Sequence, residues 1–273
     1  MLNSLGRGVT AGLLSGLLAG VFALVVGEPS IDAAIALEEA AAEAPADAPA
    51  THSHATHPHT ETHATPVAAG THGAGGHVHG GEDGISRSTQ KLGLLAGMLL
   101  YGAALGLLFG AAYAWSQGRL QGDAWTRATK LGAAAIFCLV LLPSLKFPPN
   151  PPAVGDPDTV GARTQLLLFL WVAGAGIAAA AWWAVGWCRR HGWSRPLSQS
   201  SVGLAGALLV GALLYALPRG AGAEGFPADL LWSFRVSAIA TQVLLFTGMA
   251  ALYGLLAAHE DGQVFRRVPG SSA

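Results

Sequence analysis

Length, composition and charge exclude a soluble domain. The chain has 273 residues, of which 52% are hydrophobic and only 11% charged, and its mean hydropathy is +0.44. A soluble domain carries about 25% charged residues, so this chain has too few charges to cover a globular surface, and its net charge of −1 gives no indication of nucleic-acid binding.

Six apolar segments follow one another along the chain. A membrane-spanning helix needs about 20 mostly apolar residues, because the hydrocarbon core of a bilayer is about 30 Å thick. The sequence therefore predicts an all-α, polytopic bundle of transmembrane helices. The third and fifth segments are short, and if either is re-entrant the number of spans is five. The segments are Gly8–Gly27, Leu92–Trp115, Ala128–Lys146, Gln165–Trp187, Ser201–Leu217 and Val236–Ala258.

The spans and their connections predict four parts. The first transmembrane helix covers residues 1–27, and an extracytoplasmic acidic and His-rich loop covers 28–91. The helix bundle extends over 92–258 and contains a Pro-rich outer loop, and a cytoplasmic tail covers 259–273. The first helix is interpreted as retained rather than as a cleaved signal peptide, because its apolar run is longer than the apolar region of a signal peptide, which has about 7–15 residues.

Glycines recur at every fourth position in the first two predicted spans. In lipid, helices associate by close approach of their backbones, so glycines on one face predict a helix–helix contact. A sliding or gating helix is the functional alternative to this static packing. The glycines are Gly8, Gly12, Gly16 and Gly20 in the first span and Gly102, Gly106 and Gly110 in the second.

Basic residues are distributed unequally between the two sides of the predicted bundle. With six spans both termini share a side, and that side holds nine Lys and Arg residues against six on the other. Of the sixteen acidic residues, thirteen lie on the other side, since only Asp123, Glu260 and Asp261 lie with the termini. An excess of Lys and Arg marks cytoplasmic segments. We therefore predict cytoplasmic termini and an acidic outer face that concentrates cations.

A low-complexity stretch from Ala40 to Gly84 separates the first two predicted spans. It has too few large apolar side chains to offset the entropy of ordering its backbone, so we expect disorder without a ligand. Flexible His-rich tracts bind divalent metals, because neutral imidazole is a ligand for Zn, Co, Ni and Cu. A solvated spacer is the alternative. Eight of the ten histidines lie here and are the candidate metal ligands: His52, His54, His57, His59, His63, His72, His77 and His79.

Acidic residues follow the first predicted span directly. Pro29 suits the first turn of a new helix, and on that helix Asp32, Glu39 and Glu43 fall within about 60° of arc. One interpretation is that these residues and Glu28 pass cations from the loop into a pore, because carboxylates release metal more readily than imidazole clusters do. The other interpretation is a solvated acidic face.

A proline-rich stretch, KFPPNPPAVGDPDTVGART, follows the third predicted span over residues 146–164. Its prolines and Pro143 forbid a helix, so the third span must unwind or stop here. Asp156, a proline and Asp158 form a pattern typical of an N-cap and first helical turn. The alternative is that the broken backbone beside Asn150 and the two aspartates lines a cation site, because interrupted segments mark transport sites.

Two of these stretches resemble the CbtA family, the proposed membrane subunit of a bacterial cobalt transporter. They are AGLLSGLLAGVFALVVGEPSIDAAIALEEA near the start and LKFPPNPPAVGDPDTVGART in the middle, and the number and order of the spans also fit. The resemblance implies a role in Co²⁺ uptake beside a small single-span partner that carries its own histidine cluster. It supplies no ligand residues to carry over, and the long His-rich insert departs from the family pattern.

These observations together predict a membrane subunit for uptake of a divalent transition-metal cation. Cobalt is the first candidate, with Ni²⁺ or Zn²⁺ as others, and the location is the bacterial cytoplasmic membrane. Export or tolerance with a metal-sensing loop is one alternative, and a membrane enzyme or assembly factor is another. We expect no enzyme and no required cofactor, because G-x4-G-K-[ST] and H-E-x-x-H motifs are absent from the sequence. The expected partners are the bilayer, the metal ion and the small His-containing subunit, but no nucleic acid.

Overall fold

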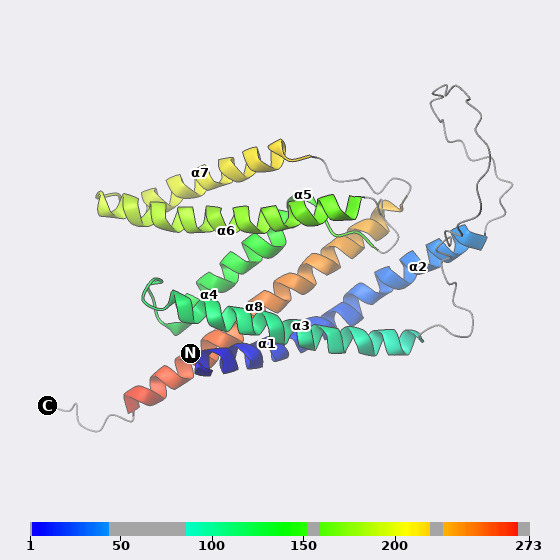
Figure 1. The fold of residues 1–273 in the computed structure, drawn as a ribbon, viewed down its shortest axis with the longest axis horizontal. Coiled ribbons are helices and arrows are strands. Elements are labelled where there is room, and N and C mark those ends of the chain that lie inside the picture. The colour runs from blue at the N-terminus through cyan, green and yellow to red at the C-terminus, as the bar shows by residue number, and fades with distance from the viewer. Residues whose placement is uncertain (1, 44–85, 152–158, 219–225, 267–273) are drawn as a thin grey trace, which may run out of the picture.

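The computed structural model describes residues 2–43, 86–151, 159–218 and 226–266. These residues are helical apart from short connections, and no strand occurs among them, which confirms the predicted all-α class (Figure 1). Two short π-helical segments, η1 and η2, interrupt the α-helices. The elements are α1 (Leu2–Phe22), η1 (Ala23–Gly27), α2 (Glu28–Glu43), α3 (Arg87–Ser116), α4 (Ala124–Ala135), η2 (Ile136–Leu141), α5 (Leu142–Lys146), α6 (Val160–Arg190), α7 (Arg195–Ala216) and α8 (Ala228–Arg266).

Among the described residues, six continuous helical runs are long and apolar enough to cross a membrane. They correspond in order to the six predicted segments. The third and fifth runs reach 23 and 22 residues because they begin earlier than predicted. Large apolar side chains such as Leu100 and Val172 are each 73% exposed, as expected where lipid covers the surface. The runs are Leu2–Ala40, Arg87–Ser116, Ala124–Lys146, Val160–Arg190, Arg195–Ala216 and Ala228–His259.

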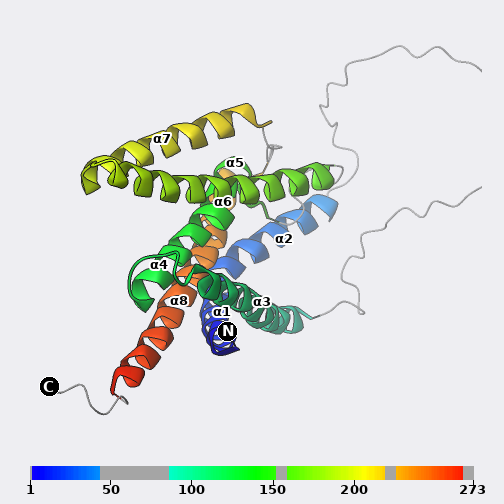
Figure 2. The same cartoon turned by 60° about the vertical axis from the view of Figure 1, so that its left-hand side comes forward.

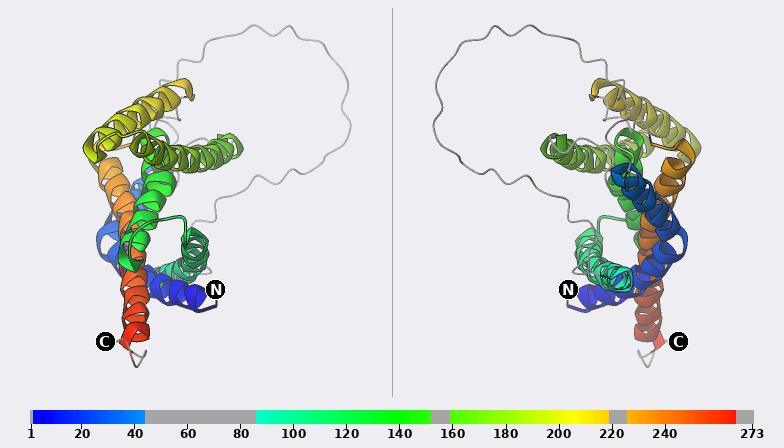
Figure 3. Two further views of the ribbon diagram at one scale, coloured as in Figure 1. Left: turned by 90° about the vertical axis from the view of Figure 1, so that its left-hand side faces the viewer. Right: turned by 90° about the vertical axis from the view of Figure 1, so that its right-hand side faces the viewer.

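The described helix ends and turns lie at two opposite ends of the bundle. The start of α1, the α3–α4 and α6–α7 turns and the end of α8 lie at one end, here called the terminus end (Figure 1). The other end, here called the loop end, holds α2, the starts of α3, α6 and α8, and the ends of α5 and α7. The α6–α7 pair lies to one side of the other helices and contacts them chiefly through η2 and α5 (Figures 2 and 3).

Helices α1 and α3 pack through the predicted glycines. A Cβ added to Gly8 or Gly12 would overlap the backbone carbonyl of Gly106 or Gly102, and the converse substitutions would overlap in the same way. The two backbones therefore touch directly, and the predicted small-residue contact is confirmed. Helix α8 completes the core, where Tyr253 is fully buried against Phe109 and Tyr113 of α3, with ring centroids 5.4 and 4.6 Å apart.

Each π-helical segment ends two residues before a proline. Glu28 directly precedes Pro29, and its amide donates to the carbonyl of Ala23, five residues earlier. Leu142 directly precedes Pro143, and its amide donates to the carbonyl of Phe137 in the same way. A proline ring clashes with the carbonyl four residues earlier in an α-helix, and the wider π turn relieves that crowding.

The helix geometry therefore corrects one expectation drawn from proline and confirms another. Pro29 does not begin a new helix, because α1, η1 and α2 form one continuous run. The third span ends at Lys146 before the proline-rich stretch, as predicted, although Pro143 lies within its last turns. Thr159 occupies the N-cap of α6 without a side-chain cap, so the helix begins after the aspartates expected to cap it. The aspartates themselves, Asp156 and Asp158, lie outside the described residues.

Candidate functional site at the loop end

Four charged side chains from α2 and α3 meet at the loop end. Arg87 Nη2 donates to Glu28 Oε1 at 2.9 Å and also to the carboxylate of Asp32. Lys91 Nζ lies 3.6 Å from Asp32 Oδ2. We call Glu28, Asp32, Arg87 and Lys91 the charged mouth. It joins the first turns of α2, which follow the first span, to the first turns of α3, which follow the His-rich segment in the chain (Figure 1).

Local helix geometry places both pairs of charges. Glu28 and Asp32 are four residues apart on α2, as are Arg87 and Lys91 on α3, so each pair lies on one face of its helix. Ser86 caps α3 by accepting from the amide of Thr89 at 3.3 Å, which makes Arg87 the first helical residue. A cation is unfavourable at the positive end of a helix dipole. The carboxylates of α2 supply the compensating negative charge.

Burial distinguishes Glu28 from the rest of the charged mouth. Its residue is 6% exposed, and within the described part of the chain it is the one charged residue that is buried. The side chains of Asp32 and Arg87 are 47% and 41% exposed. A buried carboxylate is stable only when its charge is compensated, and Arg87 provides that compensation here.

The surroundings of Glu28 are polar for a membrane span. It directly follows η1, and η1 and α2 both pack against α8. Ser30 of α2 and Ser237 and Thr241 of α8 are buried, and the two α8 hydroxyls donate to carbonyls of their own helix at 2.9 and 2.8 Å. Hydroxyl and carbonyl oxygens are weak ligands for cations, so this part of the bundle combines oxygen dipoles with a buried carboxylate that Arg87 neutralises.

The structure brings some of the predicted site residues together and separates others. Glu28 and Asp32 share the charged mouth, whereas Glu39 lies exposed further along α2. Asn150 lies against α8 instead, where Arg235 donates to its side-chain oxygen at 2.8 Å and to the carbonyl of Pro149 at 3.3 Å. The eight candidate histidines of residues 52–79 lie outside the described residues.

Basic residues at the span ends are the components that the sequence analysis missed. Arg87 and Lys91 pair with Glu28 and Asp32. Lys146 Nζ donates to the carbonyls of Leu214 and Leu217 at 2.8 and 2.7 Å, which ties α5 to the end of α7. One sequence signal was present, because Arg87 and Lys91 repeat the four-residue spacing of Glu28 and Asp32. No group of three or more potential metal-ligating side chains occurs in the part of the chain that the structure describes.

A six-span bundle with a buried carboxylate at a charged mouth defines a multi-pass membrane protein, and ionisable groups within spans are typical of ion pathways. The model of one protein family, described as probable cobalt transporter subunit (CbtA), matches residues 2–258. The chain belongs to the CbtA family, which confirms the resemblance seen in the sequence. No curated protein and no solved structure matches the chain.

Proposed function

We propose that this chain is the membrane subunit for uptake of Co²⁺, and that the charged mouth is where the cation leaves the His-rich loop and enters the bundle. The observation that carries the proposal is the buried Glu28, paired with Arg87 where the His-rich segment joins the bundle. The family description supports cobalt as the transported ion. Ni²⁺ and Zn²⁺ are the other candidates, since imidazole and carboxylate ligands also accept them.

Exchange of charge at Glu28 is the mechanism that we infer. In the structure Arg87 compensates the buried carboxylate with a single positive charge. A dication brings twice that charge, so it displaces the guanidinium from Glu28, while the partly exposed Arg87 side chain keeps its bonds to Asp32 and Gln90. An inside-negative potential then favours inward movement by about 4.6 kcal/mol per 100 mV for a doubly charged ion. The proposal therefore requires neither nucleotide hydrolysis nor a resident cofactor, and assigns no catalysis to the chain.

Uptake by a cobalt-transport-deficient bacterial host tests the function. The full chain, expressed with and without a small single-span His-containing partner, is expected to raise accumulation of radiolabelled Co²⁺ above that of the empty host. Accumulation that collapses when the membrane potential is dissipated supports potential-driven uptake. Lower accumulation than in the empty host would instead identify an exporter.

The orientation of the bundle is the first testable prediction. We propose a bacterial cytoplasmic membrane location with both termini in the cytoplasm, because the terminus side carries nine basic residues against six. Alkaline phosphatase inserted at residues 45–80 is expected to be active, and the same reporter at the C-terminus inactive. A fluorescent protein at both positions serves as the complementary control. A cytoplasmic His-rich loop would contradict uptake and favour export or metal sensing.

Metal capture by the His-rich loop is the second prediction. A peptide covering residues 50–80 is expected to bind Co²⁺, Ni²⁺ or Zn²⁺ at pH 7.5 and to release it at pH 5. The reason is that imidazole must be neutral to bind metal, and an ordinary histidine has a pKa of about 6.5. Titration calorimetry at both pH values measures the change, with a peptide whose histidines are replaced by asparagine as control. Absence of binding at pH 7.5 would reduce the segment to a spacer.

A further inference from the structure

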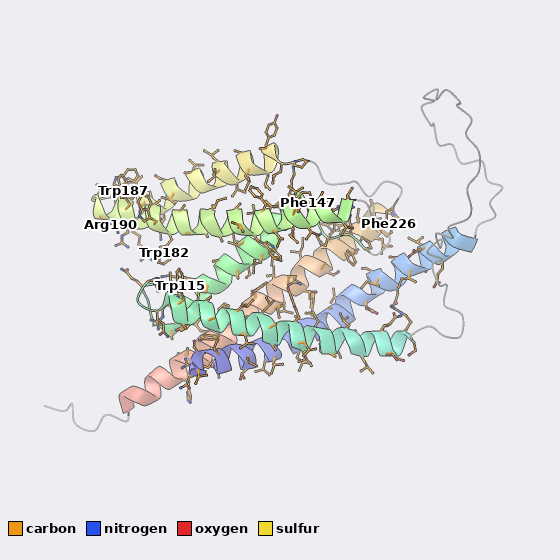
Figure 4. All side chains as sticks on the ribbon, in the orientation of Figure 1. Trp115, Phe147, Trp182, Trp187, Arg190 and Phe226 are labelled. Atoms are coloured by element: carbon orange, nitrogen blue, oxygen red, sulfur yellow. The ribbon has the colours of Figure 1, made fainter. Side chains whose placement is uncertain are left out.

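A cleft opens at the terminus end between two parts of the bundle. The α3–α4 turn and α4 form one wall, and α6 and α7 form the other, around a volume of about 1240 Å³. None of the described residues that line it is acidic. Figure 4 shows Trp115, Trp182, Trp187 and Arg190 gathered at this end, opposite Phe147 and Phe226. The cleft is lined by five basic side chains: Arg119, Lys130, Arg189, Arg190 and Arg195.

A tight turn concentrates three of these arginines. Gly192, at φ +84°, ends α6 with its amide donating to the carbonyl of Arg189, and the next amide donates to Cys188. This glycine-terminated geometry lets Ser194 cap α7 immediately, with the amide of Leu197 as donor at 3.4 Å. Arg195 then lies in the first turn of α7, where the helix dipole is unfavourable to a cation. The turn therefore presents positive charge that no described acid in the cleft compensates.

The walls of the cleft change in polarity along their length. On α6 the lining face runs from Ala178 and Val185 to Arg189, and on α7 it runs from Arg195 through Gln199 to Val202. Both helices of the α6–α7 wall are therefore basic at the terminus end and apolar toward the middle of the bundle. Such a gradient fits an amphiphile with an anionic head, whereas a free anion would make no use of the apolar part.

Aromatic side chains place the basic part of the cleft at the level of the membrane surface. Lys130 Nζ lies 5.0 Å from the ring centroid of Trp182 and donates to the carbonyl of Gln121 at 2.7 Å. The guanidinium of Arg119 lies 4.6 Å from the ring centroid of Trp115. Tryptophan is enriched at the headgroup level of bilayers. Asp123, the acid of the adjoining turn, does not line the cleft and caps α4 by accepting from the amide of Thr126 at 2.9 Å.

We propose that this cleft binds an anionic phospholipid, with its phosphate groups against the arginines of the α6–α7 turn and its acyl chains along the apolar walls. Phosphate oxygens accept charge-assisted hydrogen bonds from guanidinium groups, and basic pockets between transmembrane helices on the cytoplasmic side are suited to anionic headgroups. The lipid would bridge α4 and the α6–α7 pair, which otherwise contacts the bundle chiefly through η2 and α5. This inference does not depend on the ion transported or on its direction.

Lipid retention by the purified full chain tests the proposal. Cardiolipin, phosphatidylglycerol, phosphatidylcholine or inorganic phosphate is added to the protein in a mild detergent. Native mass spectrometry measures bound lipid, and the midpoint of thermal unfolding measures stabilisation. The two anionic lipids are expected to bind and stabilise, and the other two additives are not. Arg189→Gln with Arg195→Gln is expected to weaken anionic lipid binding about 25-fold, at about fivefold for each basic residue near an anionic surface.

Two matched variants keep the test decisive. Lys91→Gln with Arg163→Gln removes the same charge from described residues at the loop end that do not line the cleft, and is expected to bind lipid like the unmodified chain. Arg189→Lys with Arg195→Lys preserves the charge. It is expected to retain most of the binding if the glutamine variant of the same two residues is folded but deficient. Stabilisation by inorganic phosphate equal to that by lipid would overturn the lipid assignment. Equal losses in the cleft and control variants, or equal binding of phosphatidylcholine, would overturn the site.

Discussion

Replacing Glu28 by glutamine is expected to lower Co²⁺ uptake about a hundredfold at limiting metal. The amide is nearly the same size as the carboxylate, but it cannot compensate either Arg87 or an incoming cation in this buried position. A cation that enters this buried position without the carboxylate as its partner loses about 3 kcal/mol, which is about two decades of affinity at about 1.4 kcal/mol per decade. Radiolabelled uptake in the cobalt-transport-deficient host measures the loss, normalised to the amount of protein in the membrane.

A double variant separates cation binding from structural pairing. If Glu28 only neutralises Arg87, then Glu28→Gln with Arg87→Gln removes both charges and uptake is expected to recover. If Glu28 binds the transported cation, the double variant stays as deficient as the single one. The second outcome is the one that the proposed function requires, and recovery would contradict it. Glu38→Gln, which changes an exposed acid of the same helix, is expected to leave uptake unchanged.

Substitution by alanine is expected to destabilise the protein at one glycine of α3 and not at another. At Gly106 an added Cβ overlaps the backbone carbonyl of Gly8, and backbone atoms cannot move aside without separating α1 from α3. We expect a loss at the upper end of the about 1–3 kcal/mol range for overpacked contacts. At Gly97 an added Cβ meets nothing within 4 Å. Since alanine is favoured over glycine within a helix by about 0.5–1 kcal/mol, Gly97→Ala is expected to be neutral or stabilising.

The midpoint of thermal unfolding in detergent, followed by size-exclusion chromatography, measures both glycine variants. Gly106→Ala is expected to unfold at lower temperature and to yield less monodisperse protein than the unmodified chain. Gly97→Ala, on the same helix and with the same chemical change, serves as the matched control. Equal behaviour of the two variants would show that α1 and α3 do not rely on close backbone contact.

The sequence by itself determined the class of the protein, its six spans and the contact between its first two spans. These features depend on hydropathy and on spacing along one helix. An apolar run long enough to cross a bilayer is readable without knowing its neighbours, and a glycine at every fourth position marks one helix face. The same reasoning located Glu28 and Asp32 as candidates, because acids directly after an apolar span are visible in the chain.

Only the tertiary structure decided which charges meet. Arg87 lies 59 residues from Glu28 in the chain, and Arg235 lies 85 residues from the Asn150 that it binds. Such pairs depend on how each helix is rotated and on which helix it packs against, and hydropathy records neither. The two prolines show the same limit locally. Pro29 suggests the start of a new helix, and Pro143 lies inside the third span. A single π turn before each proline accommodates the ring, and packing against α8 and α6 keeps the helix continuous.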